Sequence, residues 1–189
     1  MLILASESPR RKQILESLNL TFKVIPSNAD ESFNNFFPVE YIPLILAKKK
    51  AEKVASIYSD DTIIGADTVV ILDGKIFNKP ESKQDAEETL RALSGNTHKV
   101  ITGVCIKNIS ENLTVRFSET SFVTFKKLNN DIIKKYMDSV NVMDKAGAYA
   151  VQEYGSIVIE SFSGSMSNIM GFPIEKFQES LIIFPHNFS

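Results

Sequence analysis

The 189-residue chain has room for one domain with a substantial core, since a chain of this size buries roughly 70% of its unfolded surface. Its formal net charge of −2 excludes a global basic field that draws in nucleic acid, so any anion must be bound by local basic clusters. The single cysteine, Cys105, excludes an internal disulfide, and no apolar run approaches the roughly 18 residues of a membrane span. We expect one cytoplasmic domain, residues 1–189, with no nucleic-acid or membrane partner.

Strand and helix patterns alternate along the chain, and several strands are joined by hairpins. In chain order the expected elements are a strand at 1–5, a helix from Pro9, a strand at 22–26, a helix at 39–58, a strand at 62–72, a helix at 82–95, strands at 98–109 and 113–125, a helix at 130–140, a strand at 156–162 and a helix after Pro173. Ser8 and Ser82 are expected helix caps, and Asp73-Gly74 is typical of a tight hairpin turn. This order favours an α/β fold with a mixed sheet.

The stretch ASESPRRKQIL places a serine-bearing loop and two arginines at the start of a predicted helix. Free N–H groups at a helix N-terminus suit an anion, and Ser6 adds a hydroxyl there. At about 100° per residue, Arg11 falls in line with the apolar stripe of the helix, whereas Arg10 points aside. A buried arginine needs either an anionic ligand or an acidic partner such as Glu16 or Asp30, and these residues alone leave both open.

Asp67 interrupts the apolar strand IIGADTVVIL. A carboxylate in such a run is costly unless it is paired or bound to a metal, and Gly65-Ala66 leaves backbone space for a ligand. The alternative is that Asp67 caps a turn. Asp30 and Glu31, in NADES, supply further carboxylates, although on their own such residues are more typical of a solvated loop.

Lysines provide the remaining charged candidates. In LAKKKAEKV the helical wheel turns Lys49 to solvent, while Lys48 and Lys50 flank the apolar side and either could reach a site. Lys79 precedes a proline and therefore lies in extended backbone, where a lysine is usually solvent-facing.

The sequence lacks the motifs of several classes of enzyme. No GxxxxGK[ST], GxGxxG or GxSxG pattern occurs, and His98 and His186 with one cysteine cannot build a typical zinc site. His98 starts a strand, where a structural hydrogen bond is its expected role, and Cys105 is expected to be a small buried residue. Carboxylates with arginine and lysine remain, which is the set used in magnesium-assisted phosphate chemistry.

Eight segments, in this order, resemble the motifs of Maf proteins, which are nucleoside triphosphate pyrophosphatases. The segments are ASESPRRKQIL, NADES, LAKKKAEKV, GADTVV, KP at 79–80, LSGNTHKVITGV, DKAGAYAVQ and GSMSNIMGFP. The resemblance spans residues 2–176 and implies a fold like that of inosine triphosphate pyrophosphatases: a mixed elongated sheet flanked by helices, with two lobes and a central cleft. It also implies a homodimer that uses a divalent cation, Mg²⁺ or Mn²⁺, to convert a nucleoside triphosphate to monophosphate and pyrophosphate.

The resemblance implies roles for individual residues. Asp67 corresponds to the general base that activates a water against the α-phosphorus, and Glu31 belongs with it to the metal and water site. The positions that contact phosphate or nucleotide in the family correspond to Ser6, Arg10, Arg11, Lys50 and Lys79. The resemblance thus selects Lys50 over Lys48, a choice that the wheel leaves open.

Substrate preference is implied by Arg10, Thr68 and Gln152, whose pattern resembles the dTTP/UTP-specific subfamily. The amide of Gln152 both donates and accepts hydrogen bonds, as a pyrimidine edge requires. The chain departs from the family at Phe172, where leucine is usual, and at Glu153, where glycine is usual.

Two other functions fit parts of the sequence. Sugar-nucleotide transferases also begin with a short strand and a loop that carries an arginine, but they have a longer glycine-rich loop and a larger chain. A non-catalytic nucleotide-binding regulator of cell division is the second alternative. The joint presence of Asp67, Glu31 and the basic residues favours catalysis.

Overall fold

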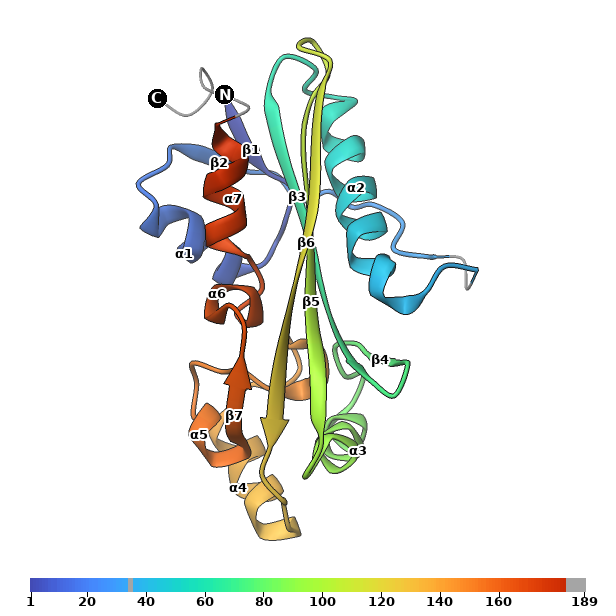
Figure 1. Ribbon diagram of the computed structural model, residues 1–189, viewed down its shortest axis with the longest axis vertical. Helices are drawn as coiled ribbons and strands as arrows, with labels where there is room; N and C mark the ends of the chain where they lie inside the picture. Colours follow the sequence, from blue (N-terminus) through green and yellow to red (C-terminus); the bar gives the residue numbers. More distant parts are fainter. Residues whose placement is uncertain (34–35, 183–189) are drawn as a thin grey trace. The chain divides into compact units, whose positions relative to one another are not determined.

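We describe the fold from a computed structural model, in which the described residues are 1–33 and 36–182; His186 lies outside them. The elements, drawn in Figure 1, are β1 Leu2–Leu4, α1 Pro9–Ser17, β2 Phe22–Val24, a 3-10 turn η1 Val39–Tyr41, α2 Ile42–Ala55, β3 Thr62–Leu72, β4 Lys75–Phe77, α3 Lys83–Leu93, β5 Thr97–Asn108, β6 Leu113–Phe125, α4 Asn130–Ser139, a 3-10 turn η2 Ala146–Ala148, α5 Gly155–Val158, β7 Ile159–Ser163, α6 Met166–Ile169 and α7 Ile174–Leu181.

The described strands form one mixed seven-stranded sheet. The strand order is β2-β1-β3-β5-β6-β7, and β4 pairs with β3 beside this path. β1 runs parallel to β2 and β3, whereas the β3–β4 and β6–β7 pairs are antiparallel. The predicted mixed α/β architecture is confirmed.

The chain divides into two compact units. Unit 1 comprises residues 1–68, 102–119 and the chain from 171, and unit 2 comprises residues 69–101 and 120–170. The chain passes from one unit to the other within β3, β5 and β6, and once more between α6 and α7. Two units agree with the two lobes that the resemblance implies, while the central cleft stays a prediction.

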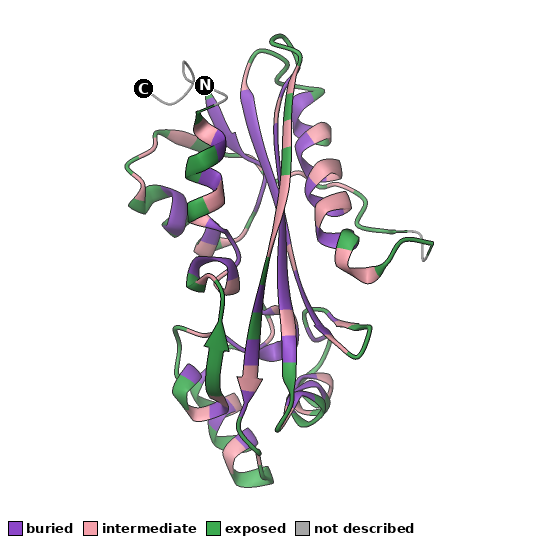
Figure 2. Cartoon of the chain, in the orientation of Figure 1, coloured by how far each residue is buried: buried purple, intermediate pink, exposed green. Residues whose placement is uncertain are grey.

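In unit 1, α2 packs directly on the sheet because small residues line the contact. A side chain at Gly65 of β3 would overlap the carbonyl oxygen of Ala47 and place its Cβ 2.7 Å from the backbone nitrogen of Ala51. Ala47, Ala51 and Cys105 are fully buried in the same cluster, as expected for Cys105. Figure 2 shows the buried face of α2 turned to the sheet. This close approach fixes the residues of α2 relative to β3.

α1 follows the predicted pattern. The Ser8 side chain accepts a hydrogen bond from the backbone nitrogen of Arg11 at 3.4 Å, and Pro9 is the first helical residue. Arg11, Ile14 and Leu15 are its buried residues, so the arginine lies on the apolar stripe.

In unit 2, His98 is a buried structural residue, as expected. Its Nε2 lies 2.8 Å from the hydroxyl of Tyr149, and both rings pack edge-on against Phe125. Its Nδ1 has no hydrogen-bond partner among the described residues.

Two predicted elements are corrected. The helix expected at 39–58 begins as a 3-10 turn, and α2 proper spans Ile42–Ala55. Its start coincides with Pro43, whose fixed φ suits the first turn of a helix. The strand expected from residue 156 begins at Ile159, because the left-handed Tyr154 starts a helical turn in which its carbonyl accepts from Ile157. The short α6, capped by Ser165, was not foreseen.

None of the helices within residues 1–33 and 36–182 combines the length and apolar character needed to cross a membrane.

Burial lowers the pKa of His98 from 6.5 to about 4, so the folded protein binds fewer protons there than the unfolded chain. The contribution of neutral His98 to the free energy of unfolding is therefore complete above about pH 6.5 and is lost as pH falls toward 4. We expect the wild-type protein to lose about 2 kcal/mol more unfolding free energy than His98→Gln between pH 7.5 and pH 5. Denaturant melts at both pH values measure this, and parallel losses in the two proteins would contradict it.

Candidate active site

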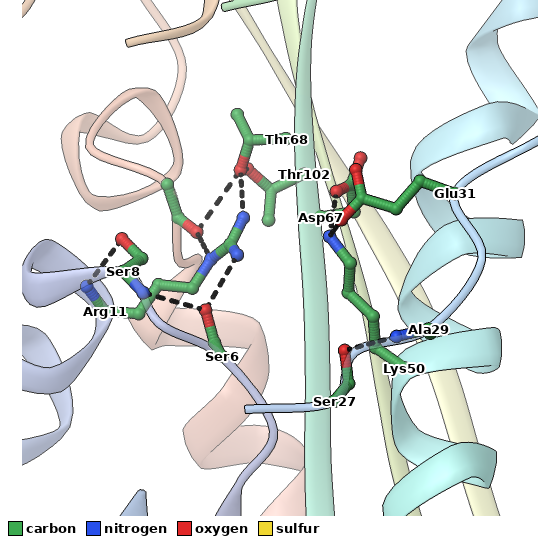
Figure 3. Close-up of polar contacts among 11 residues, drawn as sticks. Ser6, Ser8, Arg11, Ser27, Ala29, Glu31, Lys50, Asp67, Thr68 and Thr102 are labelled. Atoms are coloured by element: carbon green, nitrogen blue, oxygen red, sulfur yellow. Dashed lines mark hydrogen bonds and ion pairs between the residues drawn. The ribbon is translucent and has the colours of Figure 1, made fainter. Parts of the chain in front are cut away.

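Asp67 lies in β3 with its carboxylate buried and paired. Nζ of Lys50, on α2, lies 2.6 Å from Oδ1 of Asp67 and 2.9 Å from Oε1 of Glu31. Figure 3 shows the two carboxylates converging on this one ammonium group. Among the described residues, the second carboxylate oxygen of Asp67 has no hydrogen-bond partner. Asp67 is therefore a paired strand carboxylate rather than a turn cap, and one of its oxygens is free to meet a ligand.

The surroundings of Asp67 change its basicity. Burial raises its pKa above the ordinary 3.8, while the nearby positive charges of Lys50 and Arg11 act in the opposite direction. A raised pKa makes the carboxylate a better acceptor for a proton taken from water.

The loop that carries Glu31 is shaped by local hydrogen bonds and by a second lysine. The backbone nitrogen of Ser32 donates to Oδ1 of Asp30 at 2.9 Å, and Nζ of Lys49 donates to the carbonyl of Ser32 at 2.6 Å. Lys49, predicted to face solvent, therefore anchors this loop to α2. Lys48 pairs with Glu52 at 3.7 Å, away from Asp67.

Arg11 forms a buried network with neutral acceptors. Its Nε donates to the carbonyl of Gly171 at 3.0 Å, Nη1 to Oγ of Ser6 at 3.1 Å and Nη2 to Oγ1 of Thr68 at 3.0 Å. Thr68 in turn lies 2.9 Å, oxygen to oxygen, from Thr102. A guanidinium has five N–H groups, so two have no partner among the described residues.

The acidic partners considered for Arg11 are engaged elsewhere. Glu16 pairs with Lys12 at 3.6 Å, and Asp30 accepts from Ser32. Burial lowers the pKa of Arg11, and the neighbouring positive charge of Arg10 adds to this effect. A buried cation with two spare donors and only neutral acceptors in contact is suited to an anionic ligand.

The two clusters lie on opposite faces of β3. Asp67 and Thr68 are consecutive, so their side chains point to different sides of the strand. Figure 3 shows Lys50 and Glu31 on the side of Asp67, and Arg11 and Ser6 on the side of Thr68. The clusters still interact electrostatically, since the charges of Asp67 and Arg11 affect each other's pKa.

The remaining predicted residues are Arg10, Lys79 and Gln152. Arg10 is half-buried beside Arg11 on α1. Lys79 and Gln152 belong to unit 2, where both are exposed.

Three contributors were missed from the sequence: Thr102, Gly171 and Lys49. Thr102 and Gly171 lie within LSGNTHKVITGV and GSMSNIMGFP, so the motifs marked their segments without indicating their roles. Gly171 contributes a backbone carbonyl, which carries no side-chain signal. Lys49 acts on a loop rather than on the helix face that the wheel describes.

The acidic side of this site offers two carboxylates to a divalent cation. No cluster of three or more acidic, histidine or cysteine side chains suited to a metal occurs among the described residues. Mg²⁺ needs no such cage, because it is commonly held by one or two carboxylates together with waters and substrate phosphates. Glu31 and Asp67 supply that pair.

The fold is shared with a solved structure, that of the Ham1 protein of Staphylococcus aureus. The match covers 97% of this chain and 98% of that one, with a TM-score of 0.58 and 15% sequence identity. The chain is therefore an α/β protein of the Ham1 fold, which confirms the predicted fold class.

Sequence comparison then identifies the family. The family described as Maf-like protein matches residues 1–183, and the chain belongs to it. A relative from Fusobacterium nucleatum is 44% identical over 180 residues, 95% of this chain and 93% of its own. A relative from Thermosipho africanus is 45% identical over 176 residues, which cover 93% of this chain and 88% of its own. A relative from Pyrococcus abyssi is 44% identical over 175 residues, which cover 93% of this chain and 91% of its own. All three bear the name dTTP/UTP pyrophosphatase.

The contact at Gly65 predicts a sharp effect of one methyl group. Gly65→Ala would press Cβ into the backbone of α2 at Ala47 and Ala51, so the helix must move and carry Lys50 with it. We expect a loss of about 1–3 kcal/mol in unfolding free energy.

Gly74→Ala is the control, because its Cβ meets open space and only its positive φ of 76° costs energy. Chemical denaturation compares the two variants. Equal stability of Gly65→Ala and the wild type would rule out the close packing of α2 on β3.

Proposed function

We propose that this chain hydrolyses nucleoside triphosphates, with dTTP, UTP and modified pyrimidine nucleotides as candidate substrates, to the monophosphate and pyrophosphate. The observation that carries the proposal is the buried Asp67, paired with Lys50 through one oxygen and free at the other. The names of the relatives support the substrate class. They do not favour a sugar-nucleotide transferase or a non-catalytic regulator.

In the proposed reaction, the free oxygen of Asp67 orients a water and accepts its proton. The water oxygen bonds to the α-phosphorus, the bond from that phosphorus to the bridging oxygen breaks, and pyrophosphate leaves with the electron pair. The Lys50 ammonium, 2.6 Å from Asp67, holds the carboxylate in position for this transfer.

Glu31 and Asp67 are the residues proposed to hold a divalent cation, Mg²⁺ or Mn²⁺. When bound, such a cation neutralises charge on the triphosphate oxygens. Lys50 keeps the two carboxylates together by contacting both. Their mutual repulsion is thereby reduced.

The basic side of the site is proposed to bind phosphate. The two spare N–H groups of Arg11 and the hydroxyl of Ser6 present donors to an anion. The hydroxyl of Thr68 is engaged by Arg11, so we infer that it affects substrate preference by orienting that guanidinium.

The remaining assignments rest on the family resemblance. Arg10 and Gln152 are proposed to select the nucleotide, with the Gln152 amide on the pyrimidine edge, and Lys79 to contact phosphate. A cytoplasmic homodimer without nucleic-acid or membrane partners is proposed on the same basis.

Asp67→Asn should lower kcat about 100-fold or more while changing nucleotide affinity little, because an amide cannot accept the proton from water. Pyrophosphate release, coupled to inorganic pyrophosphatase, is measured over all common triphosphates. Asp73→Asn is the control, since it removes an equal charge from an exposed turn after β3. Near-normal turnover by Asp67→Asn would reject its role as base, and no release from any triphosphate by the wild type would reject the function.

Glu31→Gln should raise the Mg²⁺ concentration for half-maximal activity about tenfold, with kcat largely recovered at saturating metal, because one of two carboxylate ligands is lost. Titration of activity with Mg²⁺ and with Mn²⁺ tests this. Glu16→Gln, an exposed acid paired with Lys12, serves as control. An unchanged metal requirement would remove Glu31 from the metal site.

A further inference from the structure

A buried lysine lies at the base of the segment that carries Gln152 in unit 2. The Lys145 side chain is only 3% exposed, and its Nζ lies 2.9 Å from Oδ1 of Asp144 and 3.5 Å from Oε1 of Glu153. Nζ also donates to the carbonyl of Asn141 at 2.7 Å. Two of the three ammonium donors thus form hydrogen bonds, to Asn141 and Asp144, and Glu153 is an ion-pair partner.

The backbone of the segment from Ala146 to Tyr154 includes unfavourable conformations, which neighbouring groups must stabilise. Ala148 and Tyr154 both adopt the left-handed region, with φ of 59° and 53°. For residues other than glycine this conformation costs about 1–2 kcal/mol each, and it persists only where the surrounding structure holds it.

The side of the segment that precedes Gln152 is held by buried groups. The hydroxyl of Tyr136, on α4, accepts from the backbone nitrogen of Ala150 at 3.0 Å and donates to its carbonyl at 3.4 Å. Burial raises the pKa of Tyr136 to about 12, so the phenol keeps its proton. Tyr149 is fixed in the same way through His98.

The side that follows Gln152 is held by charge. Glu153 comes directly after Gln152 and meets Lys145, whose position is set by Asn141 and Asp144. Gln152 itself is exposed and has no hydrogen bond to the described residues. Its amide is therefore presented by an anchored backbone on both sides rather than by contacts of its own.

We propose that Lys145 and Glu153 form a positioning pair that holds Gln152 in place and thereby strengthens the preference of this chain for pyrimidine nucleotides. The proposal rests on the proposed function, in which Gln152 contacts the base. Neither Lys145 nor Glu153 is assigned contact with the substrate. The pair acts on the backbone that carries Gln152.

The test compares Glu153→Gln and Lys145→Met with Asp138→Asn, which removes an exposed charge from α4 in the same unit. Glu153→Gln should raise KM for UTP and dTTP about threefold, as expected for a half-exposed ion pair, and leave kcat within about twofold. The ratio of kcat/KM for UTP over GTP should fall with it. Asp138→Asn should match the wild type in all three values.

Amide hydrogen exchange of residues 146–154 supplies a readout that needs no substrate. Exchange should be faster in Glu153→Gln than in Asp138→Asn, because the segment loses an anchor. If Lys145→Met fails to fold, Glu153→Gln still decides, and Glu153→Asp should restore part of the UTP preference.

The outcomes separate this proposal from the proposed function. Faster exchange together with unchanged KM and selectivity overturns the effect of the pair on substrate preference. Unchanged exchange overturns the anchoring itself, even if the wild-type protein releases no pyrophosphate. Loss of kcat without a change in KM also contradicts a positioning role.

Discussion

The ion pair between Lys50 and Asp67 is the interaction on which the candidate site depends. A carboxylate within an apolar strand is tolerable only when a cation reaches it, and a flexible lysine reaches it only from a helix that lies close by. Gly65 provides that closeness, because its missing side chain lets α2 lie against β3. The close packing at Gly65 therefore determines which charge reaches Asp67, two residues later in the strand.

The side chains of β3 alternate between the two faces of the sheet, and this alternation places the two polar clusters of the site. Consecutive residues direct an acidic cluster to one face and an arginine network to the other, and the two clusters remain within electrostatic range of each other. Arg11 is shared by three segments distant in sequence, through Ser6, Thr68 and Gly171. The network thus joins the start of the chain, the central strand and the region before α7.

Most elements could be predicted from periodicity and capping, and Arg11 from its place on a buried stripe. The wheel could not separate Lys48 from Lys50, because the two positions flank the same stripe and only the path of the helix across β3 distinguishes them. Thr102 and the carbonyl of Gly171 escaped prediction, since their roles depend on tertiary neighbours rather than on local pattern. The predicted start of β7 was wrong because Tyr154, in the left-handed region, begins a helical turn in residues that favour a strand.

The Lys50 ammonium, which contacts two carboxylates, has a consequence for how the site forms during folding. Glu31 and Asp67 contribute two negative charges, and Lys50 with Arg11 supplies two positive ones within the same chain. A site built from carboxylates alone would repel itself until a cation arrived, and folding would then be coupled to metal uptake. Here the chain carries its own counter-ions, so the charges of the two carboxylates are balanced by groups of the protein itself.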